Sequence, residues 1–402
     1  MKSSSHLKIG RHWLQAALLC TLAAAAACRA ADPPRSAASI TDFRAEDPVL
    51  MKQRAALLDA AEAALARGDT EAAMAVFERA AGMLHAPDTE MGLVRSHMQA
   101  GQYRRALAFA AHTAGAHLEA PDASALYAWL LRAGGQDAYA RQMLEAALER
   151  SPGDEVLAAT QRAFDSATPV ASGVLLDRPH RMAPHLLAHA GSTPVQARAR
   201  VLATAVLLGD GRFALATLST PAAARRLWVR NGMGQTTSAV IDRSIADAGL
   251  VLLALERPLP ASAPLAMAPR DPFAGSPGFT VDLATSNDAT PQWPMLHAGF
   301  FAGASVGAGA GSGATRALGI ATSTGSAGAA VFDAGGRWAG IALPATAGSL
   351  TQRWVPLSQL RAWLGDLLPA PLASESAVPA RVGADEAYER ALPLVLQVLA
   401  EP

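Results

Sequence analysis

The sequence predicts a protein of the α + β multidomain class, with a helical region followed by an all-β region. Residues 48–166 carry apolar side chains at steps of three and four, the spacing that places them on one face of a helix. From about Ala197, glycine and proline become frequent and apolar runs shorten to strand length. With 402 residues, 51% of them hydrophobic, the chain is long enough to build separate cores in the two regions.

Residues 1–30 are expected to be a signal peptide. Lys2, Lys8 and Arg11 form a basic start, an alanine-rich apolar stretch follows, and small residues surround a cleavage site near Ala30. The apolar stretch is too short for a membrane span. We therefore expect export to the periplasm or beyond the cell.

Both cysteines lie in this segment, so the exported chain is expected to contain no disulfide. Cys20 falls within the apolar stretch, and Cys28 follows a run of alanines. That run is a weak form of the box that precedes a lipidated cysteine, so a lipid anchor at Cys28 stays open. The formal net charge is zero and there is no basic run, which argues against nucleic acid as a partner.

Three glycines mark a repeat in the helical region. Gly68, Gly101 and Gly135 follow one another at steps of 33 and 34 residues, each between two stretches of helical spacing. A small residue stands five positions after each glycine and an apolar one nine positions after it. This period predicts stacked helical hairpins in which small residues face large ones. The residues concerned are Ala73, Ala106, Ala140, Phe77, Ala110 and Leu144.

The pattern resembles the tetratricopeptide repeat. It covers about three repeats within residues 31–166, and Ser151 and Pro152 predict the start of a further capping helix. The aromatic residue that usually stands early in each first helix is missing. The resemblance implies a surface that holds another protein, and support of the following domain is the other role that we weigh. Residues 167–196 are a connector.

Short strands joined by turns are predicted from residue 197 to 368. Hairpin turns are expected at 209–211, 231–234 and 334–336, where glycines separate runs of strand length. No helical pattern lies between these strands, which favours a barrel or a sandwich. A short strand and a helix at 352–364 end the region.

The order of these elements resembles the trypsin-like serine proteases in their bacterial periplasmic form. The segments that carry the resemblance are "FALATL", "LVLLAL", the turn "GSAGAAVFD" and the closing "VPLSQLR". It implies two six-stranded β-barrels over residues 197–368 with a cleft between them. It also implies three positions for a Ser–His–Asp triad.

All three triad positions carry other residues. The histidine position is Ser219, the aspartate position is Gly249, and the nucleophile position is Ala327. None of these side chains can act as the base, the orienting acid or the nucleophile. The sequence therefore favours an exported relative without protease activity that binds or scaffolds other proteins in the cell envelope.

An active trypsin-like serine endopeptidase is the alternative. Shifting the count in the turn by one residue makes Ser326 the nucleophile, and His189 and Asp247 then stand in an order that suits base and acid. His297 lies in a strand-like segment without the context of a catalytic histidine.

A peptide-binding role is expected at the same turn. In this fold, backbone N–H groups at such a turn hold a developing oxyanion, and they do not depend on side-chain identity. Around Gly325, Ser326 and Ala327 they are expected to bind an extended peptide or a C-terminal carboxylate without cleaving it. A protein or peptide is therefore the expected partner.

No cofactor or metal site is expected. The glycine-rich stretch 304–319 lacks the lysine of a phosphate-binding loop. The histidines of the helical region follow no metal-ligand spacing along the chain. They are His85, His97, His112 and His117.

Two segments remain at the end of the chain. Residues 369–382 are rich in proline and serine and form a linker. Residues 383–402 are amphipathic and faintly resemble the segment that opens such protease domains. A docking helix, an additional strand and the remnant of a lost domain are the three roles left open for them.

Overall fold

The structure is a computed structural model of the chain. It describes residues 47–166, 168–189, 193–218, 226–261, 264–303, 315–323, 325–344, 352–368 and 381–402, apart from the side chains of Ala188 and Asp247. The expected signal peptide, both cysteines and Ser219 lie outside the described residues. Residues 53–402 form one compact unit, to which all spatial relations below apply.

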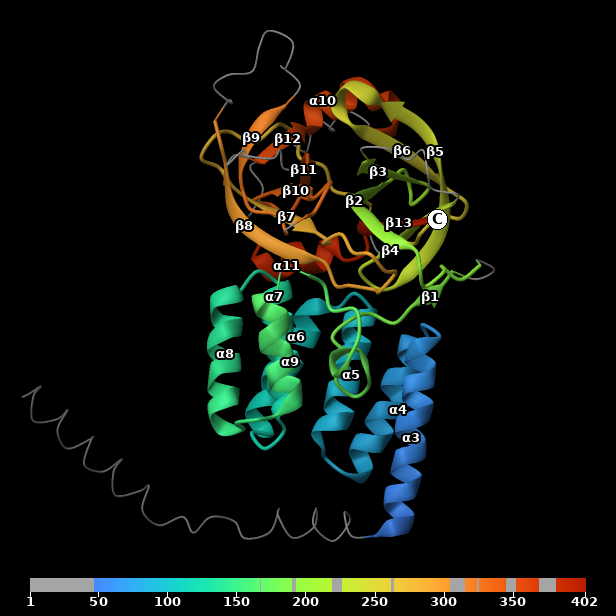
Figure 1. The fold of residues 1–402 in the computed structure, drawn as a ribbon, viewed down its shortest axis with the longest axis vertical. Helices are drawn as coiled ribbons and strands as arrows, with labels where there is room; N and C mark the ends of the chain where they lie inside the picture. The colour runs from blue at the N-terminus through green and yellow to red at the C-terminus, as the bar shows by residue number, and fades with distance from the viewer. Residues whose placement is uncertain are drawn as a thin grey trace, which may run out of the picture. The chain divides into compact units, whose positions relative to one another are not determined.

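Seven helices make up residues 48–165 of the described chain (Figure 1), as the spacing of apolar residues predicts. The six residues predicted to pack between helices, Ala73 to Leu144, are at most 3% exposed. The last helix begins at Glu155, and its N-cap is Asp154, whose carboxylate accepts from the Leu157 amide. The expected start at Ser151 is therefore wrong, because the acidic residue nearer the helix caps it. The helices are α3 (Pro48–Ala66), α4 (Thr70–Met83), α5 (Pro87–Gln99), α6 (Tyr103–Ala116), α7 (Pro121–Ala133), α8 (Asp137–Arg150) and α9 (Glu155–Asp165).

The three repeat glycines form the turns inside the hairpins α3–α4, α5–α6 and α7–α8. Each has a positive φ, 81°, 74° and 83° in chain order, a conformation that other residues adopt only at a cost. All three turns also pack against the β region. A Cβ atom placed at Gly135 would lie 2.7 Å from Leu296 Cδ2. Cβ atoms placed at Gly68 and Gly101 would each lie 2.9 Å from a side-chain atom of the β region. The side chains that the turns contact are Leu187, Met233 and Leu296.

The first β-barrel is closed and six-stranded. Its strand order is β5-β4-β13-β2-β3-β6, with β6 pairing back to β5. A two-residue strand, β1 (Leu187–Ala188), runs parallel to β5 at its edge. The six strands are β2 (Arg200–Leu208), β3 (Phe213–Thr217), β4 (Arg226–Asn231), β5 (Gln235–Ile245), β6 (Leu250–Leu255) and β13 (Val395–Glu401).

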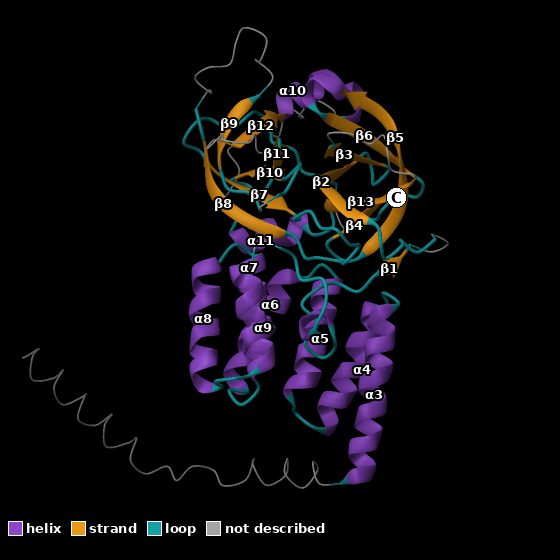
Figure 2. Cartoon of the chain, viewed as in Figure 1, coloured by secondary structure: helices purple, strands orange, loops and turns teal. Residues whose placement is uncertain are grey.

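The second barrel is also closed and six-stranded, with the order β10-β11-β12-β9-β8-β7. Figure 2 shows its strands beside those of the first barrel. Helix α10 (Leu357–Leu364) follows β12, as expected from the sequence. The strands are β7 (Pro277–Asp282), β8 (Met295–Phe301), β9 (Arg316–Gly319), β10 (Ala330–Asp333), β11 (Trp338–Ala342) and β12 (Gln352–Pro356). Helices ahead of two such barrels confirm the predicted fold class.

The C-terminal segment completes the first barrel. After helix α11 (Ala384–Ala391), strand β13 inserts between β2 and β4 and pairs antiparallel with both. All seven of its residues are buried. Of the three roles left open for this segment, the structure shows two: α11 is a helix that packs on α6, and β13 is a strand. A barrel built from residues 197–368 alone lacks one of its six strands.

The helical region and the barrels share one core. Buried residues of α5 to α9, of the second barrel and of α11 belong to one contiguous apolar cluster. Arg104 of α6 also binds Glu389 of α11 through its backbone N–H at 2.8 Å and its guanidinium at 2.9 Å. The repeats therefore support the β region, whatever else they bind.

None of the helices among the described residues is long and apolar enough to cross a membrane.

Candidate ligand-binding site

The turn predicted to hold the nucleophile joins β9 to β10 and packs against the first barrel. The Ala327 carbonyl accepts from the Thr204 amide of β2 at 2.6 Å. Gly328 has a φ of 86°, and a Cβ atom there would lie 2.3 Å from the Thr204 carbonyl oxygen. Only glycine fits at this position, so the two barrels meet at the backbone of this turn.

The backbone amides of the turn differ in their partners. Ser326 N–H donates to the Ser323 carbonyl at 2.9 Å. Among the described residues, nothing accepts from the amides of Gly325 and Ala327. Two N–H groups separated by one residue have the spacing of the pair that holds the oxyanion in Ser–His–Asp proteases.

Of the other two triad positions predicted from the sequence, Gly249 lies beside the end of β3, whereas Ser219 is outside the described residues. Leu218, the last described residue before Ser219, donates its amide to the Gly249 carbonyl at 3.2 Å. Gly249 has a φ of 63° and directly precedes β6. A Cβ atom at Gly328 would lie 3.3 Å from the Thr217 amide, so the turn reaches the end of β3.

No base contacts the Ser326 hydroxyl among the described residues. Ser326 is 8% exposed, and its Oγ is buried without a hydrogen-bond partner among the described residues. His189 instead follows β1, donates its backbone N–H to the Thr236 carbonyl at 3.2 Å and lines a separate cavity of about 660 Å³. Asp247 lies in a short 3₁₀ turn, Ala246–Ala248, and its side chain is outside the described part of the chain.

A serine, a histidine and an aspartate that we did not predict as a group meet just before the turn. Ser323 Oγ donates to Asp282 Oδ1 at 2.5 Å and lies 3.3 Å from His297 Nε2. The Ser323 amide donates to the other Asp282 oxygen at 2.8 Å. Asp282 is 0% exposed. Its two hydrogen bonds with Ser323 hold the segment that leads into the turn. Sequence reasoning missed this group because the three residues come from two strands and a loop.

This group does not have the geometry of a catalytic triad. His297 Nε2 faces both partners, at 3.3 Å from Ser323 Oγ and 3.8 Å from Asp282 Oδ1. A triad needs the aspartate on the Nδ1 side of the ring, so that Nε2 is free to take the serine proton. Here the Ser323 hydroxyl donates its hydrogen bond to the aspartate and not to the histidine. The group can therefore position the loop, but it does not activate a nucleophile.

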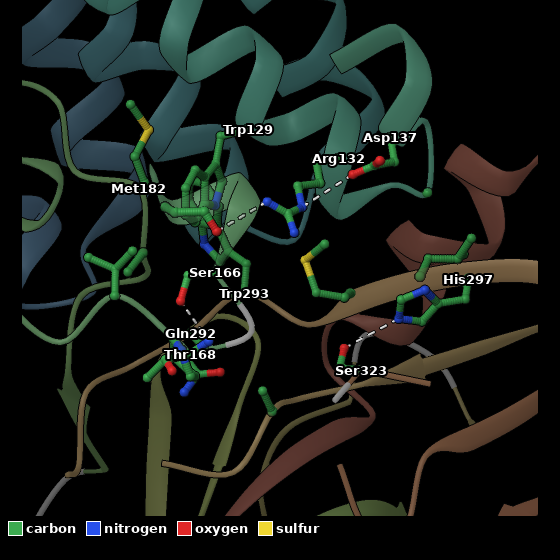
Figure 3. A pocket seen from close by; sticks show the side chains of 18 of the residues that line it. Trp129, Arg132, Asp137, Ser166, Thr168, Met182, Gln292, Trp293, His297 and Ser323 are labelled. Atoms are coloured by element: carbon green, nitrogen blue, oxygen red, sulfur yellow. Dashed lines mark hydrogen bonds and ion pairs between the residues drawn. The ribbon is translucent and has the colours of Figure 1, made fainter. Parts of the chain in front are cut away.

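A cleft of about 530 Å³ lies beside this group, between the helical region and the second barrel (Figure 3). Trp129 and Arg132 of α7 line one side, and Trp293, His297 and Ser323 line the other. The wall is largely apolar, which suits an organic ligand or a peptide side chain.

Unpaired hydrogen-bond donors also lie in the wall of the cleft. Gln292 Nε2 and Trp293 Nε1 are buried and have no acceptor among the described residues. Burial lowers the pKa of the Arg132 guanidinium, while Asp137, whose Oδ1 lies 3.4 Å from Arg132 Nε, opposes that shift. The cleft thus offers donors and a partly buried cation to a ligand that carries oxygen acceptors.

The β region has the trypsin-like protease fold. That assignment rests on the two closed six-stranded barrels and on the glycine-flanked turn between β9 and β10. No family model matches the chain, and no curated protein matches it.

The chain is similar to several solved protease structures. The MamO protease domain from Magnetospirillum magneticum is 18% identical over 44% of this chain and 94% of that one, with a TM-score of 0.35. The HtrA-type protease AlgW, in a variant with a decapeptide, is 18% identical over 40% of this chain and 50% of that one, with a TM-score of 0.35. The inactive form of the Rv3671c protease is 13% identical over 42% and 87% of the two chains, with a TM-score of 0.34.

Proposed function

We propose that this protein is an exported protein of the bacterial cell envelope that binds a peptide or protein segment and does not cleave it. The basic start and apolar stretch of residues 1–30 support export. A lipid anchor at Cys28 is compatible with the proposal.

The observation that carries the proposal is the state of Ser326. A serine hydroxyl becomes a nucleophile when a base accepts its proton. Ser326 Oγ is buried and has no hydrogen-bond partner among the described residues, and the sequence predicts Ala327 for the nucleophile position of the family that the chain resembles. The backbone amides around the turn can still hold a carbonyl or a carboxylate.

The cleft beside Trp129 and Trp293 supports peptide binding. Its apolar wall can accept a side chain, and the buried donors of Gln292 and Trp293 need acceptors. A peptide supplies both, through an apolar residue and its neighbouring carbonyl or terminal carboxylate.

An active-site-directed fluorophosphonate tests the lack of catalysis. The full chain is expected to remain unlabelled under conditions in which an active serine protease is labelled completely. The Ser326→Ala variant is the matched control, and mass spectrometry of labelled peptides separates Ser326 from Ser323. Covalent label on Ser326 that disappears in the variant would contradict the proposal and favour the endopeptidase alternative.

Tryptophan fluorescence with a peptide library tests the binding role. We expect peptides with an apolar residue near a free C-terminus to bind the full chain, and Gln292→Ala or Trp129→Ala to weaken binding at least tenfold. Trp363→Ala, on α10, removes a tryptophan outside the cleft and should leave affinity unchanged. If no peptide binds the folded chain, the helical region only supports the barrels and the binding proposal is wrong.

A further inference from the structure

We propose that His85, Glu90 and His117 form a site for a first-row divalent metal ion, of which Zn²⁺ is the best match. These residues lie in the helical region, in the α4–α5 loop, the first turn of α5 and the residue after α6. Their ligand atoms lie within 4.8 Å of one another. The proposal does not depend on the peptide-binding role.

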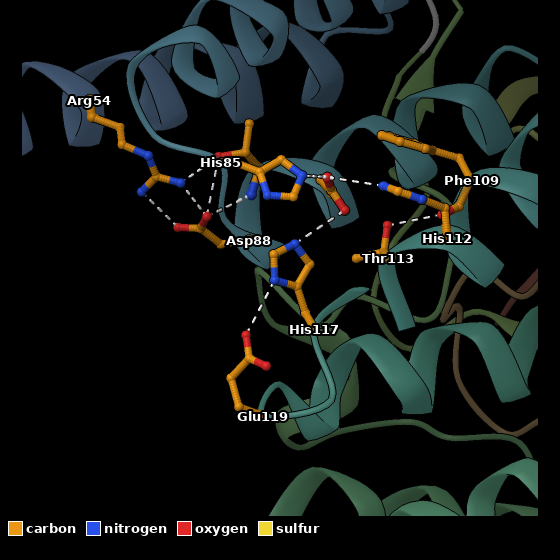
Figure 4. A network of polar contacts seen from close by, with 10 residues as sticks. Arg54, His85, Asp88, Phe109, His112, Thr113, His117 and Glu119 are labelled. Atoms are coloured by element: carbon orange, nitrogen blue, oxygen red, sulfur yellow. Dashed lines mark hydrogen bonds and ion pairs between the residues drawn. The ribbon is translucent and has the colours of Figure 1, made fainter. Parts of the chain in front are cut away.

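The three residues are arranged around one buried carboxylate. Glu90 is 4% exposed. His85 Nε2 lies 2.6 Å from its Oε1, and His117 Nε2 lies 3.6 Å from its Oε2. His112 adds a third imidazole, with Nε2 at 3.9 Å from Oε1. Figure 4 shows the three histidine side chains, each of which directs its Nε2 toward the Glu90 carboxylate.

The proton positions leave two lone pairs facing each other. His117 Nδ1 lies 3.3 Å from Glu119 Oε1, so this nitrogen carries the proton in the neutral ring. His117 Nε2 then presents a lone pair to Glu90 Oε2. Both atoms are buried, and neither has a hydrogen-bond partner among the described residues. Two buried acceptors at this separation repel each other unless a proton or a metal ion lies between them.

A metal ion resolves this arrangement. In tetrahedral zinc sites the ligand atoms lie about 2.0–2.2 Å from the metal, and hence about 3.3 Å from one another. The 3.6 Å between His117 Nε2 and Glu90 Oε2 is close to that value. Zn²⁺ would displace the proton that His85 shares with Glu90, and this pair would open by less than about 1 Å.

Glu119 has the role of an outer-shell partner. A histidine that binds a metal almost always donates its other ring N–H to a carboxylate or carbonyl, which fixes the ring and its tautomer. Glu119 does this for His117, although its own side chain is 74% exposed. Two imidazoles and one carboxylate favour zinc and its neighbours over calcium or magnesium, which prefer oxygen ligands.

Isothermal titration of the EDTA-treated full chain with Zn²⁺ at pH 7.5 tests the site. We expect one ion to bind tightly, and His85→Ala and His117→Gln to weaken binding at least tenfold. Glu119→Gln should weaken it about tenfold, since outer-shell partners contribute 10–100-fold. His97→Gln is the matched control on α5, because His97 bonds to Gln102 outside the cluster and should not affect binding.

A second readout covers variants that fold poorly. His85 is 54% exposed at its side chain, so His85→Ala is expected to keep the fold, as circular dichroism would verify. Zn²⁺ should raise the melting temperature of the wild type and not that of His85→Ala. Absence of a stoichiometric site in the wild type, or an equal melting shift in the variant, would overturn the proposal.

Discussion

The rings of Tyr103 and Tyr388 meet edge to face with their centroids 4.5 Å apart. Tyr103 belongs to the helical region and Tyr388 to the C-terminal helix that precedes β13. Each hydroxyl donates to a backbone carbonyl, Tyr103 to Leu130 and Tyr388 to Pro294. The pair therefore joins the repeats, the second barrel and the segment that completes the first barrel.

Removing the Tyr388 hydroxyl should destabilise the whole unit. Tyr388→Phe leaves the buried Pro294 carbonyl without its donor, which should lower the free energy of unfolding by about 1–2 kcal/mol. Tyr388→Ala also opens a cavity and should cost about 3–5 kcal/mol. Urea unfolding measures both. Tyr139→Phe, whose side chain lies at the surface, is the control and should change stability by less than about 0.5 kcal/mol. Equal effects of the two Tyr→Phe changes would contradict this role.

Stability should fall in weak acid because of His185. Burial, together with the charges of Arg181 and Arg95, lowers its pKa to about 4, whereas Glu62 acts in the opposite sense. Below about pH 6.5 the unfolded chain takes up a proton at this position and the folded chain does not, so the free energy of unfolding decreases as pH drops toward 4. The contribution is at most about 3 kcal/mol.

Unfolding of His185→Gln at pH 7.5 and pH 4.5 measures this contribution. The variant should lose less stability between the two values than the wild type. His97→Gln is the histidine control and should behave as the wild type. If His185→Gln keeps the full pH dependence, other groups cause it.

The barrels should not fold without the end of the chain. Val398 is 0% exposed in β13 and pairs with both β2 and β4. Val398→Asp buries a carboxylate without a partner and should prevent folding, as should deletion of residues 369–402. Arg381→Asp changes the charge at an exposed position ahead of α11 and should leave the melting temperature within a few degrees. Cooperative thermal unfolding of the deletion variant at the wild-type temperature would contradict the role of β13.

Local patterns predict the elements of this fold, and long-range pairing explains most of what they miss. Gly68, Gly101 and Gly135 mark the hairpin turns because a left-handed conformation at a helix end favours glycine. No local signal shows that β13 pairs with β2 and β4, because backbone hydrogen bonds in a barrel do not depend on the residues that make them. The expected capping helix began three residues too early because serine and aspartate both act as N-caps.

The candidate sites also divide into residues that local patterns predict and residues that only the folded chain brings together. Gly249 and Ala327 are predicted as substituted triad positions from recognisable patterns in the neighbouring strands, and they stay predictions. The group of Asp282, His297 and Ser323 could not be predicted in this way, since it forms across β7, β8 and a loop. The same holds for His85 and His117, whose separation along the chain fits no metal-binding motif although their rings are 4.8 Å apart.

Gly328 tests whether the turn must keep its backbone conformation. Its φ of 86° strains any other residue, and a Cβ atom would lie 2.3 Å from the Thr204 carbonyl oxygen, where no flexible side chain can move aside. Gly328→Ala should therefore lower the free energy of unfolding by about 2–4 kcal/mol, through strain and separation of the barrels at β2. Gly115→Ala, in a helix with nothing near its Cβ position, should stabilise by up to about 1 kcal/mol. Chemical unfolding of both variants gives the comparison. A neutral Gly328→Ala would mean that the turn can leave β2, and the amides of Gly325 and Ala327 would then not be held in place to bind a ligand.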